Sequence, residues 1–205
     1  VRASTPGTSR LSAHVIEQAG LATEAADALK LFLRLSLLQR FGRLPDWLTL
    51  GMAWNFEMEL NKGIYCLPGR TGFVGVGEHG SWEKSLRSRF RKGNQPFSFE
   101  ELIQVDTKRF SPDRSKLAFG TAGFLMRHHP EALLEFASGC VRDRIANERK
   151  DQGHGSWTLV GTYQPPAKTQ RALLEASLGD TLLDDLEASF LKGSRYKPRK
   201  KSKKR

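Results

Sequence analysis

The sequence predicts a mainly α-helical domain with one small β-hairpin and a basic C-terminal tail. Apolar residues recur at three- and four-residue spacing along most of the chain, which is typical of helices packed on a core. Capping residues and prolines stand where several of these segments begin. Hydrophobic residues make up 39% of the 205 residues, so the chain has enough apolar side chains for one domain of ordinary size.

The segment 45–60 (PDWLTLGMAWNFEMEL) has the clearest helical pattern. Its apolar residues recur every four positions at Leu48, Met52, Phe56 and Leu60. Gly51 is small, as is needed where another backbone approaches closely. We therefore expect a core helix here. Further helices are expected over 81–92, 99–104, 115–128, 130–150, 169–178 and 181–191, with Ser98 and Glu101 forming a capping box.

Two other segments carry fold predictions. Residues 29–38 (LKLFLRLSLL) have apolar side chains at seven of ten positions, on several faces, which favours a helix buried on most sides. Residues 64–66 and 73–76 flank LPGRTG, which has the turn chemistry of a short β-hairpin.

The net charge of +11 is concentrated at the C-terminus. Residues 192–205 hold nine cations and no acid, and subtracting these nine from +11 leaves +2 for residues 1–191. The organisation expected is a flexible segment 1–10, a helical domain 11–192 and a disordered basic tail 193–205. Such a tail is suited to binding polyanions without sequence preference, through Lys197, Arg199, Lys200, Lys201, Lys203, Lys204 and Arg205.

The residues point to no obvious catalytic centre. The sequence contains no HExxH or GxSxG motif, and no arrangement of histidines or cysteines at metal-ligand spacing, so we expect no metal and no cofactor. Cys66 and Cys140 are either two buried free thiols or one long-range disulfide. No apolar run reaches the roughly 18 residues that a transmembrane helix needs.

The string LPDWLTLGMAWNFE resembles the segment that follows the zinc-binding helix in gluzincin-type metallopeptidases of the peptidase MA-like clan. The helix-rich stretch SKLAFGTAGFLMRHHPEALLEFASG and the acidic ending LGDTLLDDLEASFLKG are similar to later parts of that family. The resemblance covers about residues 29–192 and implies a gluzincin-like helical fold.

This sequence departs from the gluzincin pattern at the positions that matter for zinc. The resemblance places the HExxH frame near Leu31, Phe32 and Leu35, and puts Leu50 where the family has its third ligand, a glutamate. Aliphatic side chains do not coordinate zinc. The resemblance therefore implies that the site has been filled as core, with Leu31, Leu35 and Leu50 close together inside the domain.

The function expected is that of a catalytically inactive metallopeptidase-like domain that binds or scaffolds a protein or peptide partner. One alternative is an active hydrolase that uses residues such as His79, His154 and Glu57. The other is a nucleic-acid-associated protein that acts through its tail and the basic helix 84–92.

Overall fold

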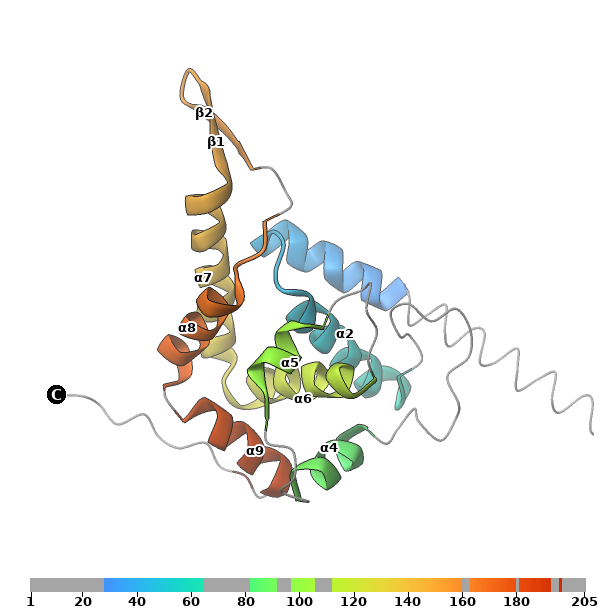
Figure 1. Ribbon diagram of the computed structural model, residues 1–205. Coiled ribbons are helices and arrows are strands. Elements are labelled where there is room, and N and C mark those ends of the chain that lie inside the picture. The colour runs from blue at the N-terminus through green and yellow to red at the C-terminus, as the bar shows by residue number, and fades with distance from the viewer. Residues whose placement is uncertain are drawn as a thin grey trace, which may run out of the picture.

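The protein is described by a computed structural model that places residues 28–64, 82–91, 97–105, 112–159, 163–179, 181–192 and 196. Its helices surround one core, and a two-stranded hairpin extends from the end of one helix (Figure 1). The prediction of a mainly helical chain is confirmed. The order of elements is a helix of residues 28–41, then α2 (Asp46–Asn61), α4 (Trp82–Arg91), α5 (Phe99–Ile103), α6 (Pro112–His128), α7 (Pro130–Glu148), β1 (Arg149–Gly153), β2 (Ser156–Leu159), α8 (Ala167–Leu178) and α9 (Leu182–Lys192).

Helices α2 and α6 pack closely against each other at the centre of the domain. Gly51 lies so near the α6 backbone that a Cβ atom there would overlap the Ala118 carbonyl oxygen. One turn later, the Asn55 side-chain amide donates a 2.7 Å hydrogen bond to the Phe119 carbonyl of α6. The core helix predicted over 45–60 is therefore confirmed, and its glycine serves the close approach that was expected.

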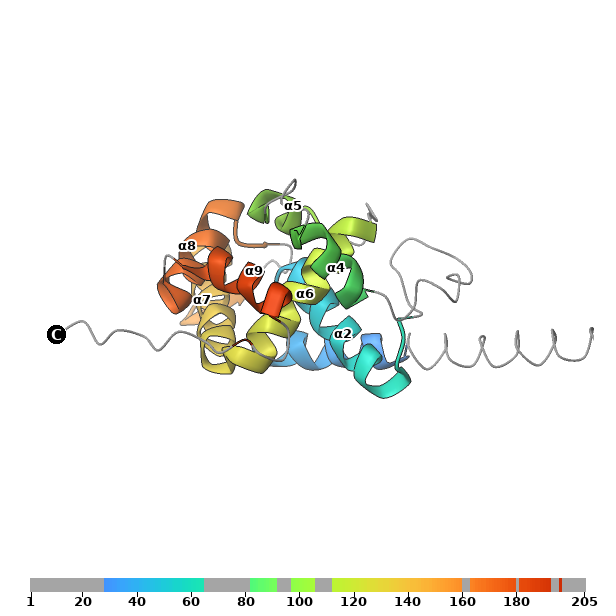
Figure 2. The same cartoon turned by 90° about the horizontal axis from the view of Figure 1, so that it is seen from below.

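Aromatic rings connect this pair of helices to α4. The Trp54 ring of α2 lies edge-on to Trp82, with the two centroids 5.3 Å apart. Trp82 in turn meets Phe119 of α6 edge-on at 5.5 Å. Such edge-to-face contacts between buried rings stabilise the packing beyond their buried area. Seen from below, α4 and α9 lie beside α6 (Figure 2).

A buried polar contact attaches α8 to the start of α2. The indole N–H of Trp47 donates to the Gln170 side-chain oxygen at 2.9 Å, and the Gln170 amide donates to the Pro165 carbonyl at 2.7 Å. Both side chains are buried, and each donor has a protein acceptor in place of the water that it loses on burial. Trp47 also packs on Phe136 of α7, which places α7 and α8 against the same side of the core.

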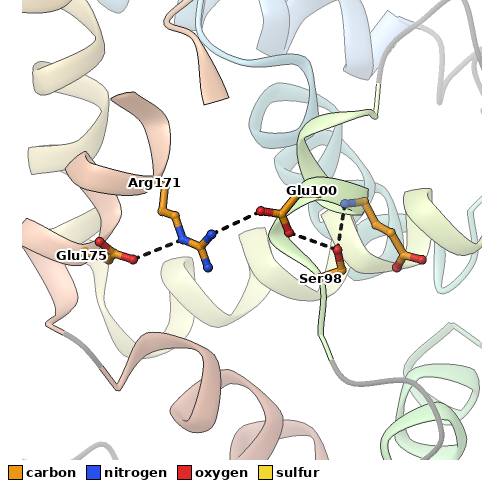
Figure 3. A network of polar contacts seen from close by, with 5 residues as sticks. Ser98, Glu100, Arg171 and Glu175 are labelled. Atoms are coloured by element: carbon orange, nitrogen blue, oxygen red, sulfur yellow. Dashed lines mark hydrogen bonds and ion pairs between the residues drawn. The ribbon is translucent and has the colours of Figure 1, made fainter. Parts of the chain in front are cut away.

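The predicted capping box at the start of α5 is present. The Ser98 hydroxyl accepts a hydrogen bond from the Glu101 backbone N–H at 3.2 Å. Arg171 of α8 forms ion pairs with both Glu100 and Glu175 at 3.2 Å, which links α8 to α5 (Figure 3). These three charged side chains are largely exposed, so the pairs orient the elements more than they stabilise them.

The hairpin lies at a place where the sequence had indicated the end of a helix and a loop. α7 passes directly into β1, and β1 pairs antiparallel with β2. His154 and Gly155 form the turn, both with positive φ, as a two-residue type I′ turn requires. β1 (RKDQG) is polar and exposed along its whole length, so it lacks the apolar alternation that marks a strand.

Other predictions concern parts of the chain that the structure does not describe. The predicted hairpin around LPGRTG, beyond Ile64, and the flexible segment 1–10 both lie outside the described residues. Within the described ranges, no helix is both long enough and apolar enough to cross a membrane.

Alanine substitutions at two helical glycines test how closely α2 and α6 approach each other. A Cβ at Gly51 meets backbone atoms of α6, whereas a Cβ at Gly139 meets the flexible end of the Leu173 side chain. We expect Gly51→Ala to lower the free energy of unfolding by about 1–3 kcal/mol. Gly139→Ala, the matched control, should be near neutral, because the gain in helix propensity offsets a small side-chain shift. Urea denaturation measures both, and equal losses would contradict the close approach.

Candidate functional site

The positions that the resemblance assigned to a former zinc site do not come together in the core. Leu50 is buried, with 1% of its surface exposed, but Leu31, Phe32 and Leu35 are 57%, 69% and 55% exposed. The prediction that Leu31 and Leu35 lie inside the domain beside Leu50 is therefore wrong. The helix of residues 28–41 exists, but it packs with one face only, so it is not buried on most sides.

The residues suggested for an alternative hydrolase do not lie together either. His154 lies in the exposed turn of the hairpin, while Glu57 is buried on α2 with 2% of its surface exposed. Figure 1 places the tip of the hairpin far from α2. His79 lies outside the described residues. A site that combines His154 with Glu57 is therefore contradicted.

Among the described residues, no group of three or more histidine, cysteine, aspartate or glutamate side chains is arranged to hold a metal ion. Cys140 is a buried free thiol, whereas Cys66 lies outside the described part. Burial, and then the charge of Asp143, raise the pKa of Cys140 to about 12. The thiol is therefore protonated at neutral pH, which makes it a poor nucleophile.

A polar cluster beside Cys140 has a structural role. Arg144 pairs with Glu148 at 2.6 Å, and Glu148 also accepts a hydrogen bond from the Tyr163 backbone N–H at 2.9 Å. The Tyr163 hydroxyl donates to Asp143 at 2.7 Å, and this bond is the main reason that the pKa of Tyr163 rises to about 12. Together these contacts fasten the segment after the hairpin to α7.

The larger of two hollows described here is a cleft of about 430 Å³ between α4, α6 and α9, which we call the α4–α6–α9 cleft. It combines aromatic surface with cationic side chains. It is lined by Glu83, Arg87, Gly120, Phe124, Arg127, His128, Ser189 and Phe190. The second hollow, of about 220 Å³, lies between the helix 28–41, α2 and α7 and has an entirely apolar lining.

Two arginines give the α4–α6–α9 cleft its charge. Arg87 donates from its Nε to the Phe190 carbonyl near the end of α9 at 3.3 Å. Arg127 stands 3.9 Å from Glu83, and both of these side chains are about half exposed, so the pair is weak. With one carboxylate and two guanidinium groups, the cleft has a formal charge of +1 when its histidine is neutral.

His128 adds a titratable group to the same cleft. Burial first, and then the charges of Arg127 and His129, lower the pKa of His128 from its ordinary 6.5. The helix dipole at the end of α6 acts in the opposite direction, but it is outweighed. The imidazole is consequently neutral at pH 7 and gains a positive charge only in acid.

Tyr196, which belongs to the predicted tail, packs on two residues that line the cleft. Its ring packs edge-on against His128 at 5.0 Å and against Phe124 at 5.8 Å, and only 6% of its surface is exposed. The expected disordered tail 193–205 therefore includes one buried residue. The residues predicted to bind polyanions begin at Lys197 and lie outside the described part.

The cationic side chains of α4 differ in their surroundings. Arg89 forms a 2.6 Å ion pair with Glu101, and Arg87 is turned into the α4–α6–α9 cleft. Lys84 and Arg91 remain exposed to solvent. Lys84, Arg87 and Arg91 are three and four residues apart and so share one side of the helix, and a nucleic-acid-binding role for it stays a prediction.

Sequence reasoning missed the cleft because its members come from three separate elements. The available signals were the arginine-rich pattern of 82–91 and the run Arg127–His129 at a helix end. Both are common features of surface helices.

Comparisons with known proteins add nothing further. No protein-family model, no curated protein and no solved structure matches this chain.

Replacing Leu50 with glutamate tests whether a latent metal site exists. Leu50→Glu places a carboxylate within the apolar core, so the melting temperature should fall, corresponding to a loss of about 2–5 kcal/mol in stability. Added zinc should not restore it. Differential scanning calorimetry with and without zinc measures this, and Leu50→Met serves as the control of similar volume. Stabilisation of Leu50→Glu by zinc would reveal ligands that are already in place.

Removing residues 197–205 tests the tail while keeping Tyr196. These residues hold seven of the nine C-terminal cations, so the shortened chain should elute from heparin at a much lower salt concentration. A second shortened chain that also lacks Tyr196 should elute similarly but melt at a lower temperature. Unchanged elution of the first would show that the folded part carries the polyanion site.

Proposed function

We propose that this chain is a non-catalytic binding domain whose α4–α6–α9 cleft receives an acidic segment of a partner protein. This keeps the binding role expected from the sequence. The proposal does not require a former zinc site that has been filled as core. The exposure of Leu31 and Leu35 argues against such a filled site. A relation to gluzincins stays a prediction that rests on the string LPDWLTLGMAWNFE.

The observation that carries the proposal is the convergence of Arg87, Arg127 and His128 on one cleft. Arginine is the side chain best suited to carboxylates, because its planar N–H groups bind both oxygens at once. The Arg87 hydrogen bond to the Phe190 carbonyl uses its Nε and leaves its terminal N–H groups for another acceptor.

The remaining lining of the cleft fits a peptide better than a bare anion. Phe124 and Phe190 provide apolar surface beside the cations, and the Phe190 ring also stacks on Phe90 at 5.3 Å. Recognition sites commonly combine such apolar surface with a few polar groups that fix orientation. An acidic residue next to an apolar one matches this combination.

The cleft should bind a capped oligoglutamate peptide, and its two arginines should account for the affinity. We expect Arg87→Gln and Arg127→Gln each to weaken binding about tenfold, since each removes a charge-assisted hydrogen bond. Glu83→Gln should strengthen binding, because it removes the competing carboxylate. Isothermal titration calorimetry measures all three. Arg142→Gln, an exposed arginine on α7, is the matched control and should bind normally.

The same titration has a predicted pH dependence. Because the pKa of free His128 is lowered, the imidazole becomes cationic only below its ordinary range, and a bound anion should raise that pKa. Binding should therefore tighten between about pH 7.5 and about pH 5.5, where glutamate stays ionised. His128→Gln should remove the change. Equal affinity at both pH values, or equal loss in the Arg142→Gln control, would contradict binding in this cleft.

A further inference from the structure

Three rings contact one another at the end of α6, and we call them the ring triad: Phe124, His128 and Tyr196. The centroids of Phe124 and His128 are 5.7 Å apart, and Tyr196 lies 5.8 Å from the first ring and 5.0 Å from the second. Phe124 and His128 are four residues apart on α6 and share one face of that helix. Both line the α4–α6–α9 cleft, whereas Tyr196 belongs to the C-terminal segment.

Tyr196 differs from the residues around it in the sequence. Residues 193–205 are rich in cations, and this tyrosine is their one large apolar side chain. Its ring is nevertheless buried, and among residues 193–205 it is the one side chain that the structure describes. A tyrosine ring supplies a large apolar area to bury. The segment after α9 is therefore attached beside the cleft through Tyr196.

The Tyr196 ring covers part of the His128 imidazole. The two rings meet edge-on, while the rest of the imidazole keeps some contact with solvent. Burial is also the main reason that the pKa of His128 lies below its ordinary 6.5. Covering by the tyrosine thus favours the neutral imidazole, because it keeps water away from a group that needs water to carry a charge.

The charges around His128 come from the elements that line the cleft. On α6, Arg127 opposes a positive imidazole, and so does His129 directly after the helix. On α4, the Glu83 carboxylate favours that charge, while Arg87 opposes it. The residues that α9 adds to the lining are uncharged. With cations on several sides, the protonation of His128 depends closely on how well it is hydrated.

We propose that Tyr196 regulates the α4–α6–α9 cleft by docking on His128. While the tyrosine is docked, the imidazole is neutral at pH 7, and the cleft attracts an acidic segment through Arg87 and Arg127. When the tyrosine leaves, water reaches the imidazole, which then takes up a proton more readily and becomes a third cation in the cleft. This inference rests on the proposed function, because the added charge acts on an acidic ligand.

The position of Tyr196 in the chain suits it to such a movement. It follows the last residue of α9, Lys192, by four residues, so it can leave His128 while that helix stays folded. Segments near a chain end that are held by few contacts open at a lower free energy than the core. Phe124 and His128, by contrast, are held by the rigid α6.

NMR titration of the histidines in the full chain, without any ligand, tests the docking. Tyr196→Ser removes the ring, so the pKa of His128 should rise toward 6.5. Tyr196→Phe keeps the ring and should keep the pKa of the unchanged chain. His128→Gln identifies the His128 signals. The signals of His154, in the exposed hairpin turn, should be the same in every variant.

Tyr163→Ser is the matched control. The Tyr163 hydroxyl bonds to Asp143 of α7, a helix that does not line the cleft. Its loss should lower the melting temperature without moving the pKa of His128, which separates a local effect of Tyr196 from a general loosening of the fold. Circular dichroism checks that each variant is folded. If Tyr196→Ser is unfolded, the milder Tyr196→Leu takes its place and should shift the pKa in the same direction.

Calorimetric titration of the capped oligoglutamate peptide relates the docking to binding. As the pH falls, binding to Tyr196→Ser should begin to tighten at a higher pH than binding to the unchanged chain, because its His128 becomes charged earlier. Absence of peptide binding in every variant would contradict the proposed function. A raised pKa of His128 in Tyr196→Ser would still support the docking in that case.

Three outcomes would overturn the inference. The first is a pKa of His128 that Tyr196→Ser leaves unchanged. The second is an equal rise in Tyr196→Ser and in Tyr163→Ser, which would assign the effect to general loosening. The third is a peptide that binds both chains with the same pH dependence although the pKa of His128 has risen, which would show that the docking does not regulate the cleft.

Discussion

The close approach of α2 and α6 at Gly51 is the contact on which the other elements depend. Because Gly51 has no side chain, the α2 backbone lies against Ala118 of α6. That distance lets the Asn55 amide reach the Phe119 carbonyl, and it brings Trp54 into the cluster with Trp82. A side chain at position 51 would separate the helices and loosen each of these contacts.

This central packing also determines the geometry of the cleft. Trp82 is the first residue of α4, and its position against Trp54 and Phe119 fixes where that helix begins. Arg87 follows after five residues of rigid helix, and Arg127 stands on α6 itself. Both arginines thus stand on packed helices rather than on loops, which would limit the entropy lost on binding of the proposed acidic segment.

Local features of the fold could be predicted from sequence, whereas features that depend on long-range packing could not. The cap at Ser98 and the helix over 81–92 were predicted because both follow from residues three or four positions apart. The hairpin after α7 was missed because its first strand, RKDQG, is polar, and its turn of His154 and Gly155 has no common hairpin signature. Cleft members more than 60 residues apart, such as Arg87 and Ser189, left no spacing to detect.

The helix of residues 28–41 shows the limit of arguments from hydrophobicity. The largely apolar composition of this helix predicts burial, because burial is the usual reason for such a composition. The same composition also arises when one face packs on the domain and the other faces a partner or a lipid surface. Periodicity does not distinguish these cases, since both place leucines all around the helix. The exposure of Leu31 and Leu35 distinguishes them.

The position of Tyr196 relates the basic tail to the cleft. Its ring packs against His128 and Phe124, two residues that line the cleft. Residues 197–205 follow Tyr196 directly in the sequence, so their seven cations would add to the attraction for the proposed acidic segment. Salt screens fully solvated charges more strongly than charges that are partly buried, as Arg87 is where it donates to the Phe190 carbonyl. Raising the ionic strength should therefore weaken an attraction that arises from the sequence after Tyr196 more than the contacts of Arg87.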